Sequence, residues 1–203
     1  MIIVGYQGIG KSTLAAKDKD FIDLESGNFF IDGFRDANWY MPYCNIAESL
    51  SQQGYNVFVS SHKAVRLRLK ESTEDVIAIV PNLNLKDQWI DKLYKRYEKS
   101  GLEKDEKAYL NAKEAYEKNI RDIMEDCVTV TIDNHINYNL YALIQTGELR
   151  LSINSLLKNS FDRSELRKIK NFLHDIVNPE EQTVTYVDKY NNKIASIKGD
   201  TEF

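Results

Sequence analysis

The chain has 203 residues, 42 % of them hydrophobic, so it can bury one good core and does not need two domains. Its 27 basic and 31 acidic residues give a formal net charge of −4 at pH 7. This balance argues against non-specific nucleic-acid binding or membrane-surface binding as the main activity, so the positive charge of any phosphate site must be local. No apolar run approaches the roughly 20 residues of a membrane span, which predicts a soluble protein.

Two further features indicate where the protein works. The first apolar run begins at Met1 without a basic region before it, so we expect no secretory leader and a cytoplasmic location. Cys44 and Cys127 have neither the spacing of a metal knuckle nor that of a disulfide framework. We therefore predict two buried thiols in a reducing compartment.

Short apolar strands alternate with helical segments along the first 150 residues. The helical segments show apolar positions at three- and four-residue spacing. Strands that alternate with helices imply a parallel sheet with right-handed crossovers and helices on both faces. The sequence therefore predicts a three-layer α/β fold with a five-stranded parallel sheet. The expected strands are residues 1–4, 21–24, 55–60, 76–80 and 128–132.

The pattern changes after Gly147. A helix is expected at residues 164–176, and residues 183–198 are typical of a hairpin that turns at Asn191 and Asn192. We interpret residues 1–150 as the core of the domain. Residues 151–203 are then a helix-plus-hairpin appendage packed on the same domain.

A glycine-rich loop follows the first strand. Gly5, four further residues, Gly10, Lys11 and Ser12 satisfy the phosphate-loop pattern GxxxxGK[ST], with a strand before it and a helix after it. Glycines let successive backbone N–H groups converge on phosphate oxygens, and the helix N-terminus adds partial positive charge. We expect Lys11 to reach the β and γ phosphates of ATP and the Ser12 hydroxyl to bind Mg²⁺. The residues expected to bind the ATP phosphates are Gly5, Gly8, Ile9, Gly10, Lys11, Ser12 and Thr13.

The ends of the other strands indicate what happens to the triphosphate. NTPases that hydrolyse it usually need an aspartate that ends a strand beside the loop, but the third strand ends in Ser60 and Ser61. Asp133 does end an apolar run, which we expect to be the last strand of the sheet, beyond the reach of magnesium. Aspartate at such a place is typical of a turn. We therefore expect a kinase for a small substrate rather than a motor ATPase.

The segments GYQGIGKST, DFIDLESGNF, VFVSSHKAVRLRL and VPNLNLKDQWIDKLYKRYEKSG follow one another within residues 1–145. In these segments the chain resembles the nucleoside and nucleotide kinases among the phosphate-loop proteins, in particular small nucleotide-kinase-like proteins encoded by bacteriophages. The resemblance implies an acceptor site between the second and third strands and a basic lid around residues 82–100. For a phage-encoded protein it also implies the host cytoplasm as location.

The resemblance further implies roles for three arginines. Arg35 lies where an arginine for the acceptor phosphate is expected, and Arg66 follows the third strand. Arg96 lies on the lid helix, while Lys92 stands where an arginine of the lid is expected. The implied roles are acceptor binding for Arg35 and Arg66 and a catalytic role for Arg96, which would close over the donor phosphates.

Two kinds of acceptor remain open. A nucleoside monophosphate offers an anionic oxygen, so it needs arginines but no general base. A hydroxyl acceptor benefits from a carboxylate that takes its proton. Asp23 and Glu25 alternate along the second strand and would project from one face, where they could orient magnesium, take a hydroxyl proton or bind a ribose. Arg35, Arg66 and Arg68 favour the monophosphate.

An aromatic group after the second strand also has two interpretations. It could form the wall against which an acceptor base stacks, or it could pack in the core, which is the more common role of such residues. Its members are Phe29, Phe30, Phe34, Trp39 and Tyr40.

The sequence thus predicts a magnesium-dependent nucleoside or deoxynucleoside monophosphate kinase that uses ATP. One alternative is a kinase for a hydroxyl acceptor, a nucleoside or small metabolite, with Asp23 as the base. The other is a nucleotide-binding regulatory module that uses ATP or GTP as a switch, with the tail as its partner-binding surface. The expected partner is a small-molecule acceptor, with no membrane and no non-specific nucleic acid, and a homodimer is compatible with the sequence.

Overall fold

The computed structural model describes residues 1–30, 34–160, 183–187 and 193–198. The chain divides into two compact units, Met1–Ser152 and Ile153–Phe203. The first unit carries the phosphate loop. No helix within the described ranges is both long enough and apolar enough to cross a membrane.

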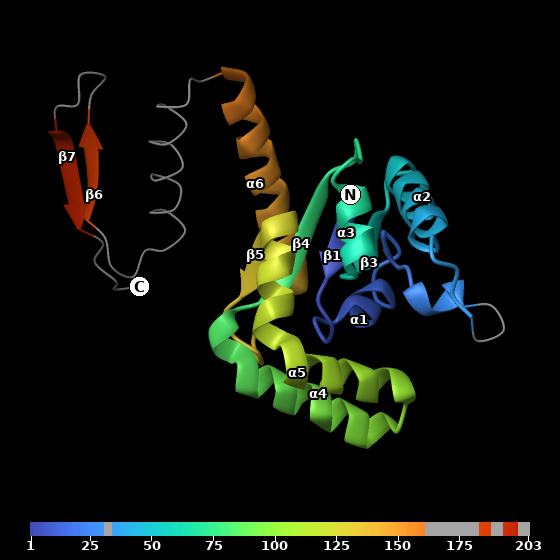
Figure 1. Cartoon of the computed structure of the whole chain (residues 1–203). Helices are drawn as coiled ribbons and strands as arrows, with labels where there is room; N and C mark the ends of the chain where they lie inside the picture. Colours follow the sequence, from blue (N-terminus) through green and yellow to red (C-terminus); the bar gives the residue numbers. More distant parts are fainter. Residues whose placement is uncertain (31–33, 161–182, 188–192, 199–203) are drawn as a thin grey trace. The chain divides into compact units, whose positions relative to one another are not determined.

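Five parallel strands form the sheet of the first unit, in the order β2-β3-β1-β4-β5 (Figure 1). This sheet confirms the expected α/β class and the expected number of strands. The strands are β1 (Ile2–Gly5), β2 (Phe21–Asp23), β3 (Asn56–Ser60), β4 (Val76–Pro81) and β5 (Val128–Ile132).

The central strand is β1, whose four residues are all buried. A continuous apolar run of this kind is typical of a parallel strand covered on both faces. At its end, Gly5 lies opposite Ser60 of β3 on one side and opposite Ile79 of β4 on the other. Because parallel strands end at the same edge of a sheet, the phosphate loop begins directly beside the end of β3.

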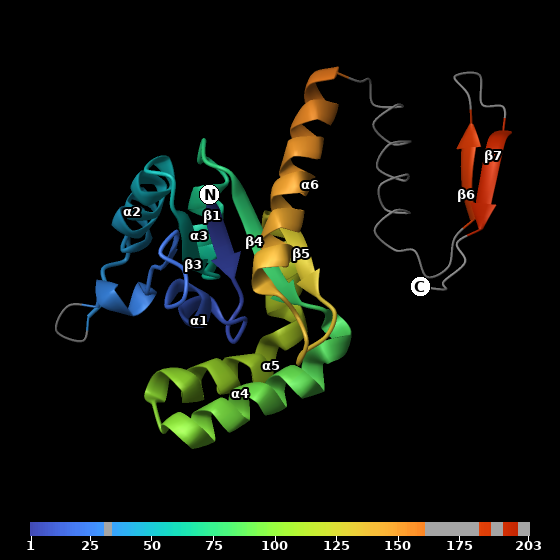
Figure 2. The ribbon, with the colours of Figure 1, turned by 180° about the vertical axis from the view of Figure 1, so that it is seen from behind.

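Helices cover both faces of this sheet. One face carries α2, α3 and α5, and α6 lies across the other (Figures 1 and 2). Gly147 permits the close approach of α6, because a Cβ atom there would lie 2.5 Å from the Ile77 side chain of β4. The helices are α1 (Lys11–Ala15), α2 (Tyr40–Gln52), α3 (Lys63–Leu69), α4 (Lys86–Ser100), α5 (Glu103–Asp126) and α6 (Leu140–Ser160), with short 3₁₀ helices η1 (Ser26–Phe29) and η2 (Leu83–Leu85).

The helices α4 and α5 lie side by side and form a hairpin beside the carboxyl edge of the sheet (Figures 1 and 2). Gly101, with φ of 62°, ends α4, and Trp89 and Leu93 of α4 are fully buried. Ala115 interrupts α5 with non-helical backbone angles, φ −138° and ψ 26°. The residues expected to form a lid, 82–100, correspond to η2 and α4, and their closure over a nucleotide stays a prediction.

The second unit contains two antiparallel strands, β6 (Thr183–Val187) and β7 (Lys193–Lys198). They pair in the manner that the expected hairpin requires. Its expected turn at Asn191 and Asn192 and the expected helix at 164–176 lie outside the described residues. That residues 151–203 pack on the core as an appendage stays a prediction.

Arg66 of α3 is buried although it is charged. Its side chain is 5 % exposed, its Nε donates to the Asp126 carboxylate at 3.0 Å, and its Nη1 donates to the Ser61 carbonyl. Lys70 pairs with the same carboxylate. Burial alone would raise the pKa of Asp126, but hydrogen bonds from Lys70 and Arg66 outweigh it and lower the pKa. The pair fixes the end of α5 to the last turn of α3.

We predict that Asp126→Asn lowers the free energy of unfolding by about 3 kcal/mol, because the buried Arg66 guanidinium loses its counter-ion. Asp122→Asn is the matched control one turn earlier on α5; its partner Lys118 is exposed and the pair is worth about 0.5 kcal/mol or less. Urea denaturation at pH 7 measures both. Equal effects of the two substitutions would contradict the prediction.

The same pair predicts a pH dependence. A carboxyl whose native pKa is lowered contributes stability above its unfolded pKa of about 3.9 and loses it as the pH falls toward the native value. The difference in unfolding free energy between wild type and Asp126→Asn should therefore be constant above about pH 5 and shrink below about pH 4. A difference that grows on acidification would contradict this assignment.

Candidate functional site

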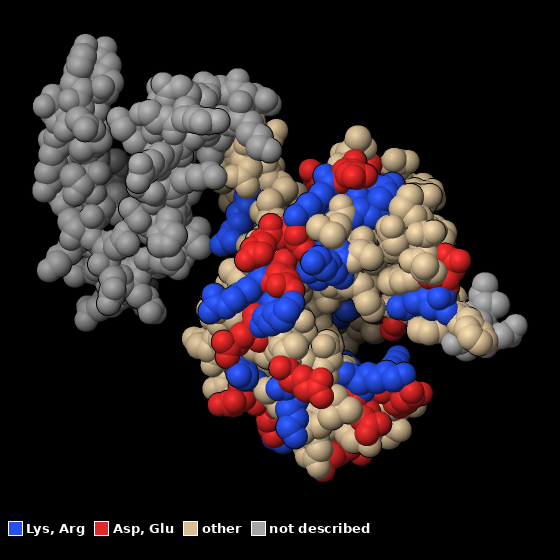
Figure 3. Space-filling model, viewed as in Figure 1, with Lys and Arg blue, Asp and Glu red and all other residues tan. Residues whose placement is uncertain are grey.

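A cleft of about 1610 Å³ opens at the carboxyl edge of the sheet. Its walls come from the phosphate loop, the ends of β2 and β3, the helices α3, α4 and α5, and the segment that precedes α6. Figure 3 shows a hollow beside the α4–α5 hairpin, on a face where basic and acidic side chains are mixed. The cleft is lined by every residue expected to bind the ATP phosphates and also by Asp23, Glu25, Arg66 and Arg96.

The phosphate loop joins β1 to α1 through two glycines with positive φ. Gly8 has φ of 84° and Gly10 has φ of 94°, a region that favours glycine. The backbone N–H groups of residues 8–12 donate no hydrogen bond to any described residue. Successive N–H groups left free in a concave loop form a site for anions. The loop can therefore hold a polyphosphate without rearranging its own hydrogen bonds.

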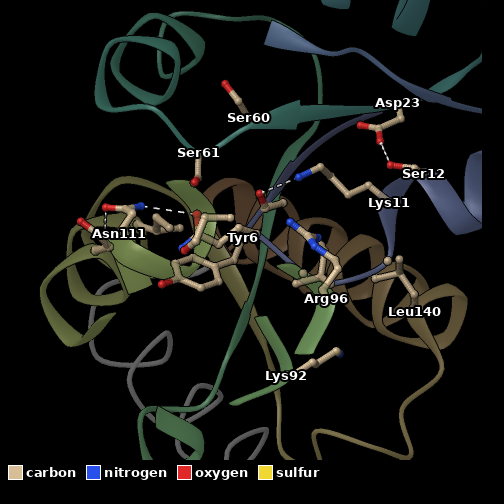
Figure 4. Close-up of a pocket in the computed structure, with 18 of the residues that line it drawn as sticks. Tyr6, Lys11, Ser12, Asp23, Ser60, Ser61, Lys92, Arg96, Asn111 and Leu140 are labelled. Atoms are coloured by element: carbon tan, nitrogen blue, oxygen red, sulfur yellow. Dashed lines mark hydrogen bonds between the residues drawn. The ribbon is translucent and has the colours of Figure 1, made fainter. Parts of the chain in front are cut away.

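The Lys11 ammonium lies over this loop and donates to the Gly5 carbonyl at 3.2 Å (Figure 4). A Cβ atom at position 5 would lie 2.5 Å from Lys11 Cδ, so any larger residue there would displace the Lys11 side chain. Burial lowers the pKa of Lys11, whereas the charges of Asp23 and Glu25 oppose that shift. A phosphate bound against the loop would provide the full counter-charge that this ammonium lacks.

Ser12 and Asp23 come together on the same wall (Figure 4). The Ser12 hydroxyl donates to the Asp23 carboxylate, with 2.6 Å between Oγ and Oδ2. Mg²⁺ takes one or two such oxygen ligands and completes its shell with water and substrate phosphates, so this donor pair fits it. No group of three His, Cys, Asp or Glu in the described part of the chain could hold a metal ion. Glu25 lines the cleft nearby, with the Lys104 ammonium 3.8 Å away.

The wall formed by β2 and β3 is held by Tyr43 of α2. Its hydroxyl donates to the Leu24 carbonyl at 2.7 Å and accepts from the Ser60 N–H at 2.8 Å. The Ser60 hydroxyl in turn lies 2.9 Å from Nδ1 of His62, whose pKa is lowered by loss of hydration and by nearby cations. Neutral polar groups therefore line the end of β3, on the side expected to receive the acceptor.

The two arginines expected to bind the acceptor are both engaged elsewhere. Arg66 lines the cleft, but two of its nitrogens bond to Asp126 and Ser61 as described above. Arg35 does not line the cleft: its Nη2 donates to the Ser26 carbonyl at 2.6 Å. Its guanidinium lies 3.9 Å from the centroid of the Trp39 ring. Roles of Arg35 and Arg66 in acceptor binding stay predictions.

Arg96 reaches the cleft from α4 and turns toward Lys11 (Figure 4). Its Nη2 pairs with Asp105 Oδ1 at 2.7 Å, and that carboxylate is 8 % exposed and also accepts from Ser100 Oγ. The pairing holds the guanidinium within reach of the donor side, near enough to Lys11 to lower its pKa. A catalytic role for Arg96 stays a prediction.

The aromatic group after β2 divides between packing and exposure. Phe29 and Trp39 contact Tyr43, with ring centroids 5.2 and 5.4 Å apart, and pack against the core. Phe30 and Phe34 are 50 % and 82 % exposed. Core packing therefore accounts for the inner members, and a stacking role is open only to the outer ones.

Cys44 and Cys127 are free, the first buried and the second half-buried, and burial raises the pKa of each thiol to about 11. Asp133 follows the edge strand β5, with β4 between it and the phosphate loop strand. Its carboxylate accepts from Asn82 Nδ2 at 3.0 Å. None of these three residues lines the cleft.

Two residues at the loop were not assigned a site role from the sequence. Trp89 was only part of an apolar helix face, and its Nε1 donates to the Gln7 carbonyl at 2.9 Å. Tyr138 had no role, and its hydroxyl donates to the Ile9 carbonyl at 3.1 Å. The two residues of the second contact are 129 positions apart in the chain. No local pattern signals a contact of that range.

No protein-family model matches this chain. No curated protein matches it either. The structure is similar to a crystal structure of shikimate kinase from Bacteroides thetaiotaomicron, at 18 % sequence identity and a TM-score of 0.46, over 77 % of this chain and 97 % of that one. A likeness of this degree carries no argument about activity, which has to be argued from the site.

We predict that Gly8→Ala lowers both the stability of the protein and its affinity for pyrophosphate. Its positive φ would cost an alanine about 1–2 kcal/mol, and the added Cβ would lie 2.9 Å from Leu93 Cδ2. Gly27→Ala is the matched control, because no atom lies within 4 Å of a Cβ there. Thermal melting should show a fall of several degrees for Gly8→Ala and little change for the control. Equal melting temperatures would contradict the loop geometry.

Proposed function

We propose that the protein is an ATP-dependent kinase that transfers the γ-phosphoryl group to a small-molecule acceptor. One observation carries the proposal: the Ser12 hydroxyl bonds to Asp23 at 2.6 Å beside a phosphate loop with free N–H groups. The motif supports a nucleoside triphosphate as donor. The cleft continues from the loop to the ends of β2 and β3, which leaves space for a second substrate beside the donor.

In this proposal the loop and Lys11 hold the β and γ phosphates, and Ser12 with Asp23 holds Mg²⁺. The metal supplies neutralisation of the charge that develops on the transferred group. Arg96 adds positive charge from the α4 side, where it acts on the same oxygens. The α4–α5 hairpin borders the cleft and excludes water from the donor phosphates.

A hydroxyl acceptor is one candidate, and the environment of Asp23 favours it. Among the described residues its carboxylate makes no ion pair with a lysine or arginine within 4 Å. It lines the cleft with Ser60 and Ser61 on the neighbouring strand. For this acceptor, Asp23 takes the proton of the hydroxyl in the transition state, and Mg²⁺ is then held by Ser12 and the phosphates.

A nucleoside or deoxynucleoside monophosphate is the other candidate, and the charge at the start of α3 favours it. Lys63 and Arg66 both line the cleft beside Ser61. An acceptor phosphate would gain charge-assisted hydrogen bonds from two such side chains. Arg66 would serve it through the Nη2 atom, since its Nε and Nη1 are bonded within the protein.

We predict that Lys11→Ala keeps the fold and lowers affinity for ATP about ten- to a hundredfold, because the phosphates lose a charge-assisted bond. Lys19→Ala, an exposed lysine that does not line the cleft, is the control variant.

Incubation of wild type with ATP, Mg²⁺ and a panel of nucleosides, nucleoside monophosphates and hydroxy acids, followed by chromatography, identifies the acceptor. ATP binding by wild type without transfer to any acceptor would instead favour the regulatory-switch alternative.

The two candidate acceptors predict opposite results for two variants: the substitution that impairs the enzyme more for one acceptor impairs it less for the other. For a hydroxyl acceptor, Asp23→Asn should lower kcat about a hundredfold or more and Lys63→Ala, at the first residue of α3, should be nearly silent. For a monophosphate, Asp23→Asn should keep considerable activity and Lys63→Ala should raise the acceptor KM. Steady-state kinetics on the best acceptor, at fixed ATP and Mg²⁺, distinguish the two. Full activity of both variants would refute both assignments.

A further inference from the structure

The phosphate loop is held from its carbonyl side by side chains that come from two distant parts of the chain. Trp89 of α4 donates to the Gln7 carbonyl at 2.9 Å. Tyr138, in the segment before α6, donates to the Ile9 carbonyl at 3.1 Å. The two aromatic rings lie 6.2 Å apart, centroid to centroid. The loop is therefore bonded on one side by two donors that belong to neither the strand before it nor the helix after it.

These carbonyl bonds determine the direction of N–H groups. In a trans peptide the C=O of one residue and the N–H of the next point in opposite directions, and the described chain has no cis peptide bond. A carbonyl of Gln7 that is bonded to Trp89 turns the Gly8 N–H to the other side of the loop. A carbonyl of Ile9 that is bonded to Tyr138 does the same for the Gly10 N–H.

A cation completes the arrangement. The Lys92 ammonium donates to the Tyr138 hydroxyl oxygen at 3.0 Å and lies 4.2 Å from the Trp89 ring centroid. No ion pair of Lys92 with a carboxylate occurs within the part of the chain that the structure describes. Since Lys92 supplies its own proton to the shared bond, the single proton of Tyr138 is left for the loop carbonyls, Ile9 at 3.1 Å and the more distant Gly8 at 3.5 Å. A charged donor on the oxygen also strengthens the bond that the hydroxyl donates.

We propose that Trp89 and Tyr138 are positioning residues for the donor polyphosphate, and that Lys92 acts through Tyr138 rather than by contact with the phosphates. The pair keeps the N–H groups of Gly8 and Gly10 aimed at the phosphate oxygens before the nucleotide arrives. The N–H groups of the loop then do not have to be reoriented when the nucleotide binds. The inference rests on the proposed function, because it assumes that the loop binds a nucleoside triphosphate.

Tyr138→Phe tests the first part, because it removes one hydroxyl and keeps the ring. Affinities for pyrophosphate, ATP and adenosine are measured by calorimetry, with Mg²⁺ present. We expect pyrophosphate and ATP to bind about three- to tenfold more weakly, which corresponds to the loss of one hydrogen bond. The affinity for adenosine should not change, because adenosine has no phosphate for the loop to bind. Tyr141→Phe is the matched control, since Tyr141 is 46 % exposed and does not line the cleft.

Three outcomes would overturn the assignment of Tyr138 or separate it from the proposed function. Unchanged affinity for pyrophosphate overturns it. Equal weakening of adenosine and ATP also overturns it, because the hydroxyl would then act on the nucleoside. A wild-type protein that binds neither ATP nor pyrophosphate refutes the proposed function itself. Trp89→Phe, with its folding checked by thermal melting, repeats the test on the second donor and should weaken pyrophosphate by a similar factor.

A double-mutant cycle tests the role of Lys92. Lys92→Met should weaken pyrophosphate binding about threefold in the wild-type background and have almost no effect in the Tyr138→Phe background. Direct contact of the ammonium with phosphate would give the same loss in both backgrounds. That additive result would overturn the indirect role of Lys92. A merely structural role would lower the melting temperature of the variants without a difference between pyrophosphate and adenosine.

Discussion

The site depends on the pairing of β1 with a strand on each side. Because β3 and β4 both hydrogen-bond to it, the end of β1 cannot shift relative to the sheet, and the loop that follows starts from a fixed point. Lys11 and Ser12 are then only a few residues from that point. Asp23 reaches them from β2 across one intervening strand. The chemistry proposed for the cleft therefore depends first on the order of the strands, because that order brings the side chains together.

The five parallel strands were predictable from the sequence because the apolar runs are short, continuous and separated by helical patterns, whereas their order in the sheet comes from the structure. The phosphate loop was equally accessible, since Gly5, Gly10, Lys11 and Ser12 form a motif whose spacing has a physical reason. The contact of Ser12 with Asp23 needed the fold, because it follows from where β2 lies and not from the spacing of the two residues. The hydrogen bond of 2.6 Å between Ser12 and Asp23 brings together two residues whose roles were predicted separately.

Side-chain partners were harder to anticipate than backbone positions. Arg66 follows β3 as expected, but its burial depends on a carboxylate 60 residues later, at Asp126. Arg35 is placed by aromatic rings and by the Ser26 carbonyl. An arginine in the sequence shows that a charge is present and how long its side chain is. Which group it pairs with depends on the packing of several helices. For this reason the positions of the phosphate-loop residues could be predicted more completely than the partners of the two arginines.

The interruption of α5 at Ala115 divides that helix into two lengths with different attachments. The part after Ala115 ends at Asp126, whose ion pair fixes it to α3. The part before it belongs to the hairpin with α4, and α4 is bonded through Trp89 to the phosphate loop. The start of α4 stays attached after the interruption as well, because Lys86 pairs with Glu117. A bend at Ala115 would therefore displace mainly the far end of the hairpin and the Ala108 carbonyl, which accepts from Gln7 Nε2. Motion of that end would reach the phosphate loop through the side chain at position 7.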